Sequence, residues 1–493
     1  MPTLEFFDKR PALWLALGAA LCTVTLIQTP VAILAWVLPV PFLRYVRLRP
    51  GWRGSAAVAV ALVLGLTVAV LRIVTEPIPL IMAPMFSVPI GLLSVAAYAL
   101  VGNVSLRPAF RIPAFAAMAA LAELVQREAT PLLSWGALGY SQVEDLPLMQ
   151  LAAIGGLGLL SFLIHAVAAT LEAALAGERV RGPALGLAGA LVLAHGWGSA
   201  RLQGTESTGA ETVLVATVDT PSDIGGPDLP PDAVVQDWNA TLAARTRRAA
   251  AAGARLVVWT EASTLARRDD VPALHAMLSD LAVETGVELV VGYVVPLEGP
   301  PFRYENTYVF VRPDGSVHHT YLKHRPVPGE PAVRGTAPQQ VVETAIGRVG
   351  GAICYDYDAP RLALGHARLG ADLVAVPSSD WRGIDPVHTR MAAVRAIEGG
   401  HSVLRSTRWG LSAGVDPVGR MRAWRSSFDD DDGVLLVRLP REGRWTLFSV
   451  LGELGVGVLL GLVLITSVLG DRYARSHAVE RPDHRRPSRP RGL

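Results

Sequence analysis

The chain has 493 residues, of which 51% are hydrophobic and only 18% are charged. A soluble enzyme carries about 25% charged residues, so this composition excludes an ordinary soluble protein and indicates a membrane protein. The formal net charge of +2 gives no reason to expect a nucleic-acid partner, and two cysteines exclude a disulfide framework.

Hydrophobic segments fill the first part of the chain and recur once near its end. A helix that crosses a bilayer needs roughly 20 apolar residues, and eight segments are candidates. They cover residues 12–28, 31–46, 55–74, 78–101, 112–125, 148–175, 183–197 and 448–469. We therefore expect about seven spans within residues 1–205 and a last transmembrane helix over residues 446–470. The remaining residues, 471–493, are expected to form a basic, disordered tail.

Arginines gather on one side of this predicted bundle. They occupy the connections after the second, fourth and sixth spans, and the tail that follows the eighth. These arginines are Arg44, Arg47, Arg49, Arg53, Arg107, Arg111, Arg179, Arg181, Arg472, Arg475, Arg481, Arg485, Arg486, Arg489 and Arg491. The positive-inside rule places this side in the cytoplasm, so the large polar domain is expected outside. The tail is expected to mark topology and to contact anionic headgroups rather than nucleic acid.

Residues 210–442 have the composition of a soluble domain, in which strand-like and helix-like stretches alternate. The expected strands cover residues 212–217, 256–259, 288–295, 347–354, 372–377, 402–406 and 411–415, with a hairpin at 304–322. The expected helices cover residues 230–252, 271–285, 361–370 and 386–399. This pattern predicts an α/β domain with a sheet covered on one face, which can pair with a second sheet to form a sandwich.

Three reactive side chains stand where predicted strands end, in the order Glu261, Lys323 and Cys354. A thiol needs a base to become a thiolate, and a cation to hold the charge that develops on an attacked carbonyl. A lone buried cysteine is ordinarily a core residue, as we expect of Cys22 in its apolar segment. With two ordered partners, Cys354 is instead predicted to be the nucleophile of a Glu-Lys-Cys triad.

The sequence gives no reason to expect a metal or a cofactor. Cysteines and histidines nowhere have metal-ligand spacing, and there is neither a P-loop nor a dinucleotide fingerprint. His388 is accordingly expected to be a helix histidine with satisfied hydrogen bonds.

Around the three reactive residues, the domain resembles the nitrilase, or carbon–nitrogen hydrolase, superfamily. Its three signature sites match residues 257–262 (Val-Val-Trp-Thr-Glu-Ala), 321–324 (Tyr-Leu-Lys-His) and 353–356 (Ile-Cys-Tyr-Asp). This resemblance implies an αββα sandwich and a Glu-Lys-Cys triad, which Glu261, Lys323 and Cys354 match.

The membrane part resembles one family within that superfamily, the apolipoprotein N-acyltransferases. The matching segments are residues 138–142, 147–152, 161–163, 395–400, 403–407 and 416–420. That family combines several spans, an external nitrilase domain and one last span. The resemblance covers nearly the whole chain and implies a multi-pass enzyme of the bacterial cytoplasmic membrane with an extracytoplasmic catalytic domain. We expect it to act as a monomer.

The resemblance also implies a reaction, in which a fatty acyl group moves from a phospholipid to the amine of diacylglyceryl-cysteine in lipoproteins. Cys354 would carry the acyl group as a thioester, and Glu261 would take and return protons. Lys323 would stabilise the oxyanion, together with the backbone N–H of Tyr355. Glu330 matches the family's second glutamate and would orient Lys323 or relay protons.

Three loops depart from the family's pattern. The segment from His324 to Glu330 is shorter than usual and contains an arginine, and Asp356 replaces a glutamate. Residues 378–382 read Ser-Ser-Asp-Trp-Arg instead of Asn-Asp-Ala-Trp-Phe. Asp380 and Trp381 are therefore candidates for substrate contact, although Trp381 could be a core residue and Asp356 a solvated turn residue. Because these loops shape acyl entry and the acceptor site, the chemistry is better defined than the substrate.

Two other functions stay open. A membrane-anchored amidase would use water in place of the amine, and the altered loops favour this alternative. A transporter or scaffold is compatible with the number of spans, but it does not account for the triad, and the spans lack paired intramembrane charges. An acylated enzyme would exclude a scaffold, and aminolysis or hydrolysis of that intermediate would separate the two enzymes.

Overall fold

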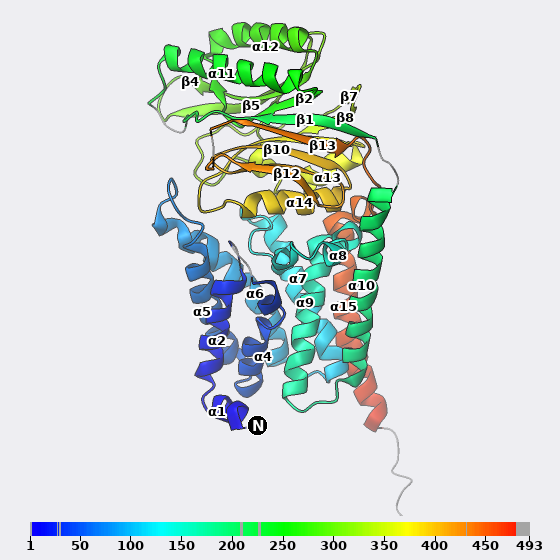
Figure 1. Ribbon diagram of the computed structural model, residues 1–493. Coiled ribbons are helices and arrows are strands. Elements are labelled where there is room, and N and C mark those ends of the chain that lie inside the picture. The colour runs from blue at the N-terminus through cyan, green and yellow to red at the C-terminus, as the bar shows by residue number, and fades with distance from the viewer. Residues whose placement is uncertain are drawn as a thin grey trace, which may run out of the picture.

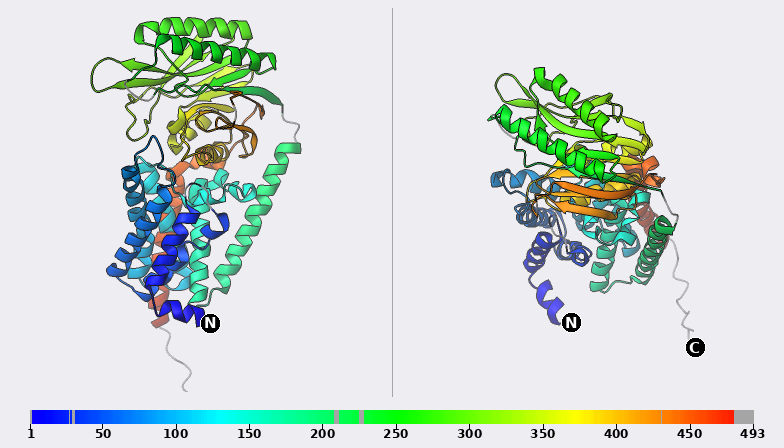
Figure 2. Two further views of the ribbon diagram at one scale, coloured as in Figure 1. Left: turned by 60° about the vertical axis from the view of Figure 1, so that its left-hand side comes forward. Right: turned by 45° about the horizontal axis from the view of Figure 1, so that its top comes forward.

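The computed structural model describes residues 2–26, 28, 31–207, 211–224, 228–429 and 431–479. A helical bundle lies at one end of the molecule and an α/β domain at the other, with the N-terminus at the far end of the bundle (Figures 1 and 2). The chain enters the α/β domain from the bundle and returns to it in its last helix (Figure 1).

The bundle contains helix in each of the eight segments predicted as spans. Its helices are α1 (Pro2–Asp8), α2 (Ala12–Thr25), α3 (Ala32–Ala35), α4 (Pro39–Leu48), α5 (Trp52–Val70), α6 (Ala83–Asn103), α7 (Pro108–Ala129), α8 (Leu146–Met149), α9 (Ala152–Leu175), α10 (Arg181–Ser207) and α15 (Leu447–Val479). In the described residues, five helices are long and apolar enough to cross a membrane, and α2 is apolar but shorter.

Three of these helices differ from the prediction. The second predicted span is divided into α3 and α4. Pro39 lies at the start of α4, where its missing N–H leaves no helix hydrogen bond unmade. Helix α10 continues to Ser207, past the expected end at residue 197. Helix α15 continues to Val479, so residues 471–479 of the expected disordered tail are helical. The rest of that tail lies outside the described residues.

Helix α9 contains a kink that its glycines permit. Gly156 has a φ of +58°, in the left-handed region that favours glycine. A Cβ at this position would lie 2.5 Å from the ring of Phe448 in α15, so a larger residue would also clash. The kink lets the backbone N–H of Leu157 donate to Glu398 of the α/β domain at 3.1 Å.

The α/β domain is built from two sheets packed face to face. The first has the order β13-β1-β2-β4-β5-β6, with β3 beside β4, and the second has the order β12-β11-β10-β9-β8-β7. The strands are β1 (Thr212–Val218), β2 (Leu256–Trp259), β3 (Thr264–Leu265), β4 (Glu288–Leu297), β5 (Arg303–Val311), β6 (Val317–Leu322), β7 (Val341–Thr344), β8 (Gly347–Gly351), β9 (Leu373–Ser379), β10 (Ser402–Arg408), β11 (Leu411–Val415), β12 (Met421–Ser426) and β13 (Val434–Pro440).

Helices cover the outer faces of both sheets, which makes the domain the expected αββα sandwich. Helices α11 (Asp232–Ala251) and α12 (Val271–Thr285) lie on the first sheet, away from the bundle (Figure 1). Helices α13 (Pro360–Arg368) and α14 (Val387–Gly399) lie between the second sheet and the bundle (Figure 1). Buried aliphatic side chains such as Val258, Val290 and Leu404 fill the space between the sheets. The parallel strands β1, β2 and β4 are nearly continuous apolar runs because both of their faces are covered.

A buried ion pair on α14 fastens the domain to the bundle. Arg395 pairs with Glu398 one turn later. Its Nη2 also donates to Ser134 Oγ at 2.8 Å and to Tyr140 Oη at 2.7 Å, both in the connection between α7 and α9. Glu398 reaches the kink of α9 through Leu157. The α/β domain and the bundle therefore share one continuous polar contact within an apolar interface.

Replacing Arg395 by leucine should lower the midpoint of thermal unfolding in detergent. The change leaves Glu398 buried without its cation, which typically costs about 3–5 kcal/mol. The matched control is Arg247→Ala, because the partner of Arg247, Glu284, lies on the exposed face of the domain. That control should leave the midpoint nearly unchanged. Equal shifts in the two variants would contradict the structural role given to the α14 ion pair.

Candidate active site

The structure brings Glu261 and Lys323 into direct contact beside Cys354. Glu261 follows β2, Lys323 follows β6, and Cys354 begins a 3-10 turn after β8, in the opposite sheet. Lys323 Nζ donates to Glu261 Oε1 at 2.7 Å. The strand predicted to end at Cys354 stops at Gly351, and the turn that follows presents the thiol.

The backbone at this site is unusual for residues that are not glycine. Cys354 has a φ of +46°, and Ala262, directly after Glu261, has a φ of +48°. Few residues with a side chain adopt this region, and such strain is concentrated at functional sites. The observation supports a function for both strand ends that is independent of any sequence motif.

A second carboxylate and an amide complete the surroundings of Lys323. Glu330 Oε2 lies 2.8 Å from Lys323 Nζ and also accepts the backbone N–H of Val327 at 2.8 Å. Asn306 Nδ2 donates to Glu261 Oε1 at 2.8 Å and to Glu330 Oε1 at 3.0 Å. Sequence reasoning missed Asn306, whose only signal is an amide within the apolar strand β5.

Burial and charge set the protonation of these groups. Burial disfavours the charge on Lys323, but Glu261 and Glu330 outweigh it and raise the pKa of the lysine well above its ordinary value. Burial likewise opposes the charge on Glu330, yet Lys323 lowers the pKa of that carboxyl. For Cys354, burial and the charge of Glu261 raise the pKa of the thiol well above its ordinary value. Cys354 is therefore a thiol at rest and needs a base when it reacts.

Asp356 holds the chain that follows Lys323. Its Oδ2 accepts the Tyr321 hydroxyl at 3.0 Å and the His324 N–H at 3.2 Å, and its Oδ1 accepts the Arg325 N–H at 2.6 Å. The side chain is fully buried, which rules out the solvated turn residue considered above. Burial raises the pKa of Asp356 to about 6. This carboxylate holds the chain around the lysine through the Tyr321 hydroxyl before it and the backbone N–H groups of His324 and Arg325 after it.

Tyr355 and Trp381 join the catalytic domain to the bundle. The Tyr355 hydroxyl donates to the carbonyl of Pro131, in the connection after α7. Trp381 Nε1 donates to the carbonyl of Ile73, in the connection after α5, at 2.7 Å. Trp381 is thus half-buried at an interface between the two parts rather than within the core of the domain.

An apolar cavity of about 50 Å³ lies between the two parts, with Cys354 in its wall. Both parts of the molecule contribute to its lining, which is almost entirely apolar. The lining residues are Ile73, Val74, Ile78, Met82, Phe86, Leu132, Trp135, Val327, Pro328, Cys354, Tyr355, Ser379, Trp381, Ile384 and His388. The thiol therefore borders an apolar space between the bundle and the α/β domain.

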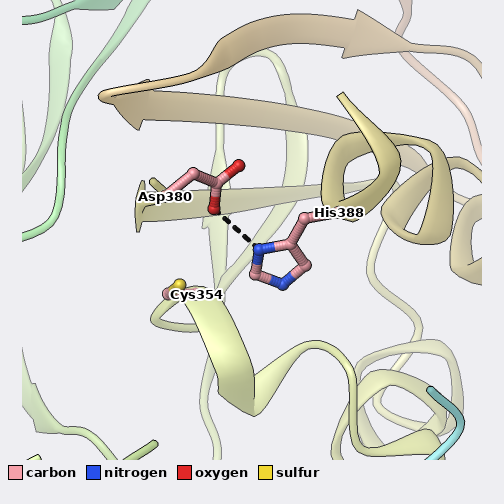
Figure 3. Close-up of side chains that lie close together, drawn as sticks. All are labelled: Cys354, Asp380 and His388. Atoms are coloured by element: carbon pink, nitrogen blue, oxygen red, sulfur yellow. Dashed lines mark hydrogen bonds and ion pairs between the residues drawn. The ribbon is translucent and has the colours of Figure 1, made fainter. Parts of the chain in front are cut away.

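His388 lies beside the thiol, a placement that sequence reasoning missed because His388 is distant from Cys354 in the chain. Cys354, Asp380 and His388 each place one ligand-type atom within 4.8 Å of the others (Figure 3). Such a group could hold a metal ion, but both imidazole nitrogens face carboxylates and Arg405 is paired with Asp380. These contacts are those of an ion-pair network. Asp380, expected to contact substrate, is a member of this network.

Comparisons with known proteins agree for both parts of the chain. Residues 211–446 match the family model of carbon-nitrogen hydrolases, and residues 18–170 match that of the apolipoprotein N-acyltransferase N-terminal domain. The chain is similar to the apolipoprotein N-acyltransferase of Bradyrhizobium diazoefficiens, with 30% identity over 420 residues and 75% of each chain covered. It is also similar to that of Rhodopseudomonas palustris, with 29% identity over 389 residues and 69% of each chain covered.

Among solved structures, an amidase from Nesterenkonia sp. is similar with 22% identity and a TM-score of 0.39. The match covers 47% of this chain and 91% of that one.

Replacing Asp356 by asparagine should slow the acylation of Cys354 by a chromogenic ester about tenfold or more. An amide has one acceptor oxygen where the carboxylate has two. At least one of the three groups that donate to Asp356 would therefore face the amide NH₂ of the asparagine. In the parent, the rate should fall below about pH 6 as Asp356 takes up a proton. The variant should show a smaller fall, because asparagine mimics the protonated Asp356. The control is Asp314→Asn, in an exposed turn. A burst as fast as that of the parent enzyme would mean that Asp356 does not position Lys323.

Proposed function

Because the chain belongs to the apolipoprotein N-acyltransferase family, we propose that it transfers a fatty acyl group from a phospholipid to the N-terminal amine of a diacylglyceryl-cysteine lipoprotein. The acyl group is carried by Cys354. The observation that carries this proposal is the position of the thiol, in the wall of an apolar cavity between the bundle and the catalytic domain. The proposal includes a monomeric enzyme, which is supported by the reactive groups and the cavity all belonging to one chain.

In the first half-reaction, Cys354 becomes acylated. Glu261 takes the thiol proton while Sγ attacks the ester carbonyl of the phospholipid. The bond between the carbonyl carbon and the glycerol oxygen then breaks, and Glu261 returns the proton to the leaving alcohol. The products are a thioester on Cys354 and a lysophospholipid.

Lys323 is the electrostatic partner of this step. Its ammonium is held by Glu261 and Glu330 before the substrate arrives, so it needs no reorganisation when charge develops on the carbonyl oxygen. Positioned donors of this kind are typically worth about 3–4 kcal/mol each. Asn306 bridges the two carboxylates and keeps them on the lysine. The backbone N–H of Tyr355 is a second donor for the oxyanion.

In the second half-reaction, the amine of the diacylglyceryl-cysteine attacks the thioester carbonyl. Glu261 takes a proton from the attacking nitrogen, the C–S bond breaks, and the proton passes to Sγ. An amide forms and the thiol is regenerated. Glu330 keeps Lys323 in place in both half-reactions. Asn306 donates to both carboxylates and so connects Glu330 to Glu261.

The apolar cavity is the site for the acyl chain. Each buried CH₂ group contributes about 0.8 kcal/mol, so an aliphatic chain is favoured over a polar acyl group of the same length. Trp381 lies in the cavity wall and is fastened to the bundle, which places it beside the part of the chain nearest the thiol.

We also propose that eight helical crossings place the catalytic domain outside the cytoplasm. The N-terminus and the connection between α9 and α10 lie at the end of the bundle opposite the α/β domain (Figure 1). The arginines of that end are paired there: Arg44 with Asp8, and Arg47 with Glu172 at 2.6 Å and with Glu178 at 3.0 Å. An arginine-rich end faces the cytoplasm by the positive-inside rule. The α/β domain then lies on the extracytoplasmic face.

Incubation with phospholipid alone should make the enzyme heavier by one acyl chain, as measured by intact mass spectrometry. A diacylglyceryl-cysteine peptide should then remove this adduct and appear as an amide. Cys354→Ala should form no adduct, whereas the matched Cys22→Ala should behave as the parent does, because Cys22 is buried in α2. An adduct on Cys354→Ala would disprove the assignment of the nucleophile. Release as free fatty acid at the same rate with and without the peptide would instead identify a hydrolase.

A membrane-impermeant thiol reagent should label Glu298→Cys in intact spheroplasts but not Arg179→Cys. Both positions are exposed, the first in the α/β domain and the second between α9 and α10. The background for both variants carries Cys22→Ala and Cys354→Ala. Arg179→Cys should become reactive only after permeabilisation. Labelling of Arg179→Cys alone in intact spheroplasts would reverse the orientation.

A further inference from the structure

Four buried charged side chains form a network beside Cys354, on elements different from those of Glu261 and Lys323. Asp358 follows the turn that begins at Cys354, Asp380 follows β9, His388 lies in the first turn of α14, and Arg405 lies in β10. Each is at least nine-tenths buried. The triad proposed above uses none of them.

The geometry of the network determines the protonation of His388. Nδ1 lies 2.7 Å from Asp380 Oδ1, and Nε2 lies 3.0 Å from Asp358 Oδ1 (Figure 3 shows the first contact). Carboxylates accept hydrogen bonds, so these two contacts favour a hydrogen on each ring nitrogen, and only the imidazolium carries both. Burial opposes this charge, but the two carboxylates outweigh it and raise the pKa of His388 to about 9.

Arg405 supplies the second positive charge. Its Nη1 and Nη2 donate to the two oxygens of Asp380 at 3.0 and 2.8 Å. Nη2 also lies 2.9 Å from His388 Nδ1, so the two cations share the same carboxylate oxygen. Two carboxylates and two cations make the network neutral when His388 is protonated, and they leave it with one net negative charge when it is not.

A tryptophan of the bundle packs over this network. Trp135, in the connection after α7, donates from Nε1 to Asp358 Oδ2 at 3.0 Å. Its ring lies 5.6 Å from that of His388. Among the described residues, the charged groups that bond the His388 ring are Asp358, Asp380 and Arg405, and the Trp135 indole and the Cys354 thiol lie beside it.

We propose that His388 is a positioning residue for Cys354: held as an imidazolium by Asp358 and Asp380, it keeps the network beside the thiol neutral and so permits the thiolate to form. The inference rests on the proposed function for the role of Cys354 as nucleophile. A neutral His388 would leave one negative charge within about 5 Å of the sulfur. At an effective dielectric constant of about 20, one charge at that distance changes an ionisation equilibrium about 300-fold.

The test measures the alkylation of Cys354 by iodoacetamide as a function of pH, which requires neither phospholipid nor acceptor. All variants carry Cys22→Ala, so Cys354 is the one remaining thiol. His388→Gln removes the imidazolium, and Asp358→Asn with His388→Gln removes one charge of each sign. His275→Gln is the matched control, because His275 lies on α12 and contacts Tyr293.

His388→Gln should alkylate about tenfold or more slowly at neutral pH, with its titration moved to higher pH. The double variant should recover most of the lost rate because its network is neutral again, and His275→Gln should match the parent. In the parent, the rise of the rate should flatten above about pH 9, where His388 loses its proton. This flattening should be absent from His388→Gln.

An unchanged profile in His388→Gln, or a double variant as slow as the single one, would overturn the inference in favour of a merely structural histidine. If His388→Gln does not fold, the Asp358→Asn variant alone tests the inference. It removes a negative charge, so its alkylation should be at least as fast as that of the parent, and a slower rate would also overturn the inference. If the parent enzyme follows these alkylation profiles but forms no acyl adduct with phospholipid, the inference about the network stands and the proposed function is disproved.

Discussion

The active site depends on an ammonium group that is buried between two carboxylates. Lys323 is almost completely inaccessible to water, and a single charge in such a place would be strongly unfavourable. Glu261 and Glu330 remove that cost, and Asn306 ties the two carboxylates together. The same arrangement favours the thiol form of Cys354, since burial and Glu261 both raise its pKa. A buried, charged site beside a protonated thiol follows from one set of contacts.

The second constraint is that the catalytic domain is completed by the membrane part. The cavity at Cys354 takes its walls from both parts, and Tyr355, Trp381 and Trp135 each bond across the boundary. Helix α14 connects the two ends of this boundary, with His388 near the thiol and the Arg395–Glu398 pair at the kink of α9. An isolated α/β domain would lack the cover of its own active site. This explains why a hydrolase-type fold is joined to a bundle at this face.

Errors in the predicted elements arose where tertiary contacts override local pattern. The edge strands β12 and β13 were not predicted. Polar and apolar residues are mixed in β12, which becomes a strand by pairing with β11, whereas β13 is an almost wholly apolar run that pairs with β1. The last helix, α15, is predicted to end with its apolar residues. It continues to Val479 because Asp471 binds Arg107 and Arg475. The second span was expected as one helix, although its prolines divide it.

The sequence by itself determined the two-part architecture and made Glu261, Lys323 and Cys354 candidates, whereas Glu330 became one through the family resemblance. Hydrophobic run length and strand-end position are local properties, so they can be read without a fold. Only the tertiary structure decided that Asp356 holds the backbone around Lys323, that Asn306 bridges the glutamates, and that His388 lies beside the thiol. Those roles depend on contacts between residues that are far apart in the chain and on burial, which disfavours a charge unless an opposite charge lies beside it.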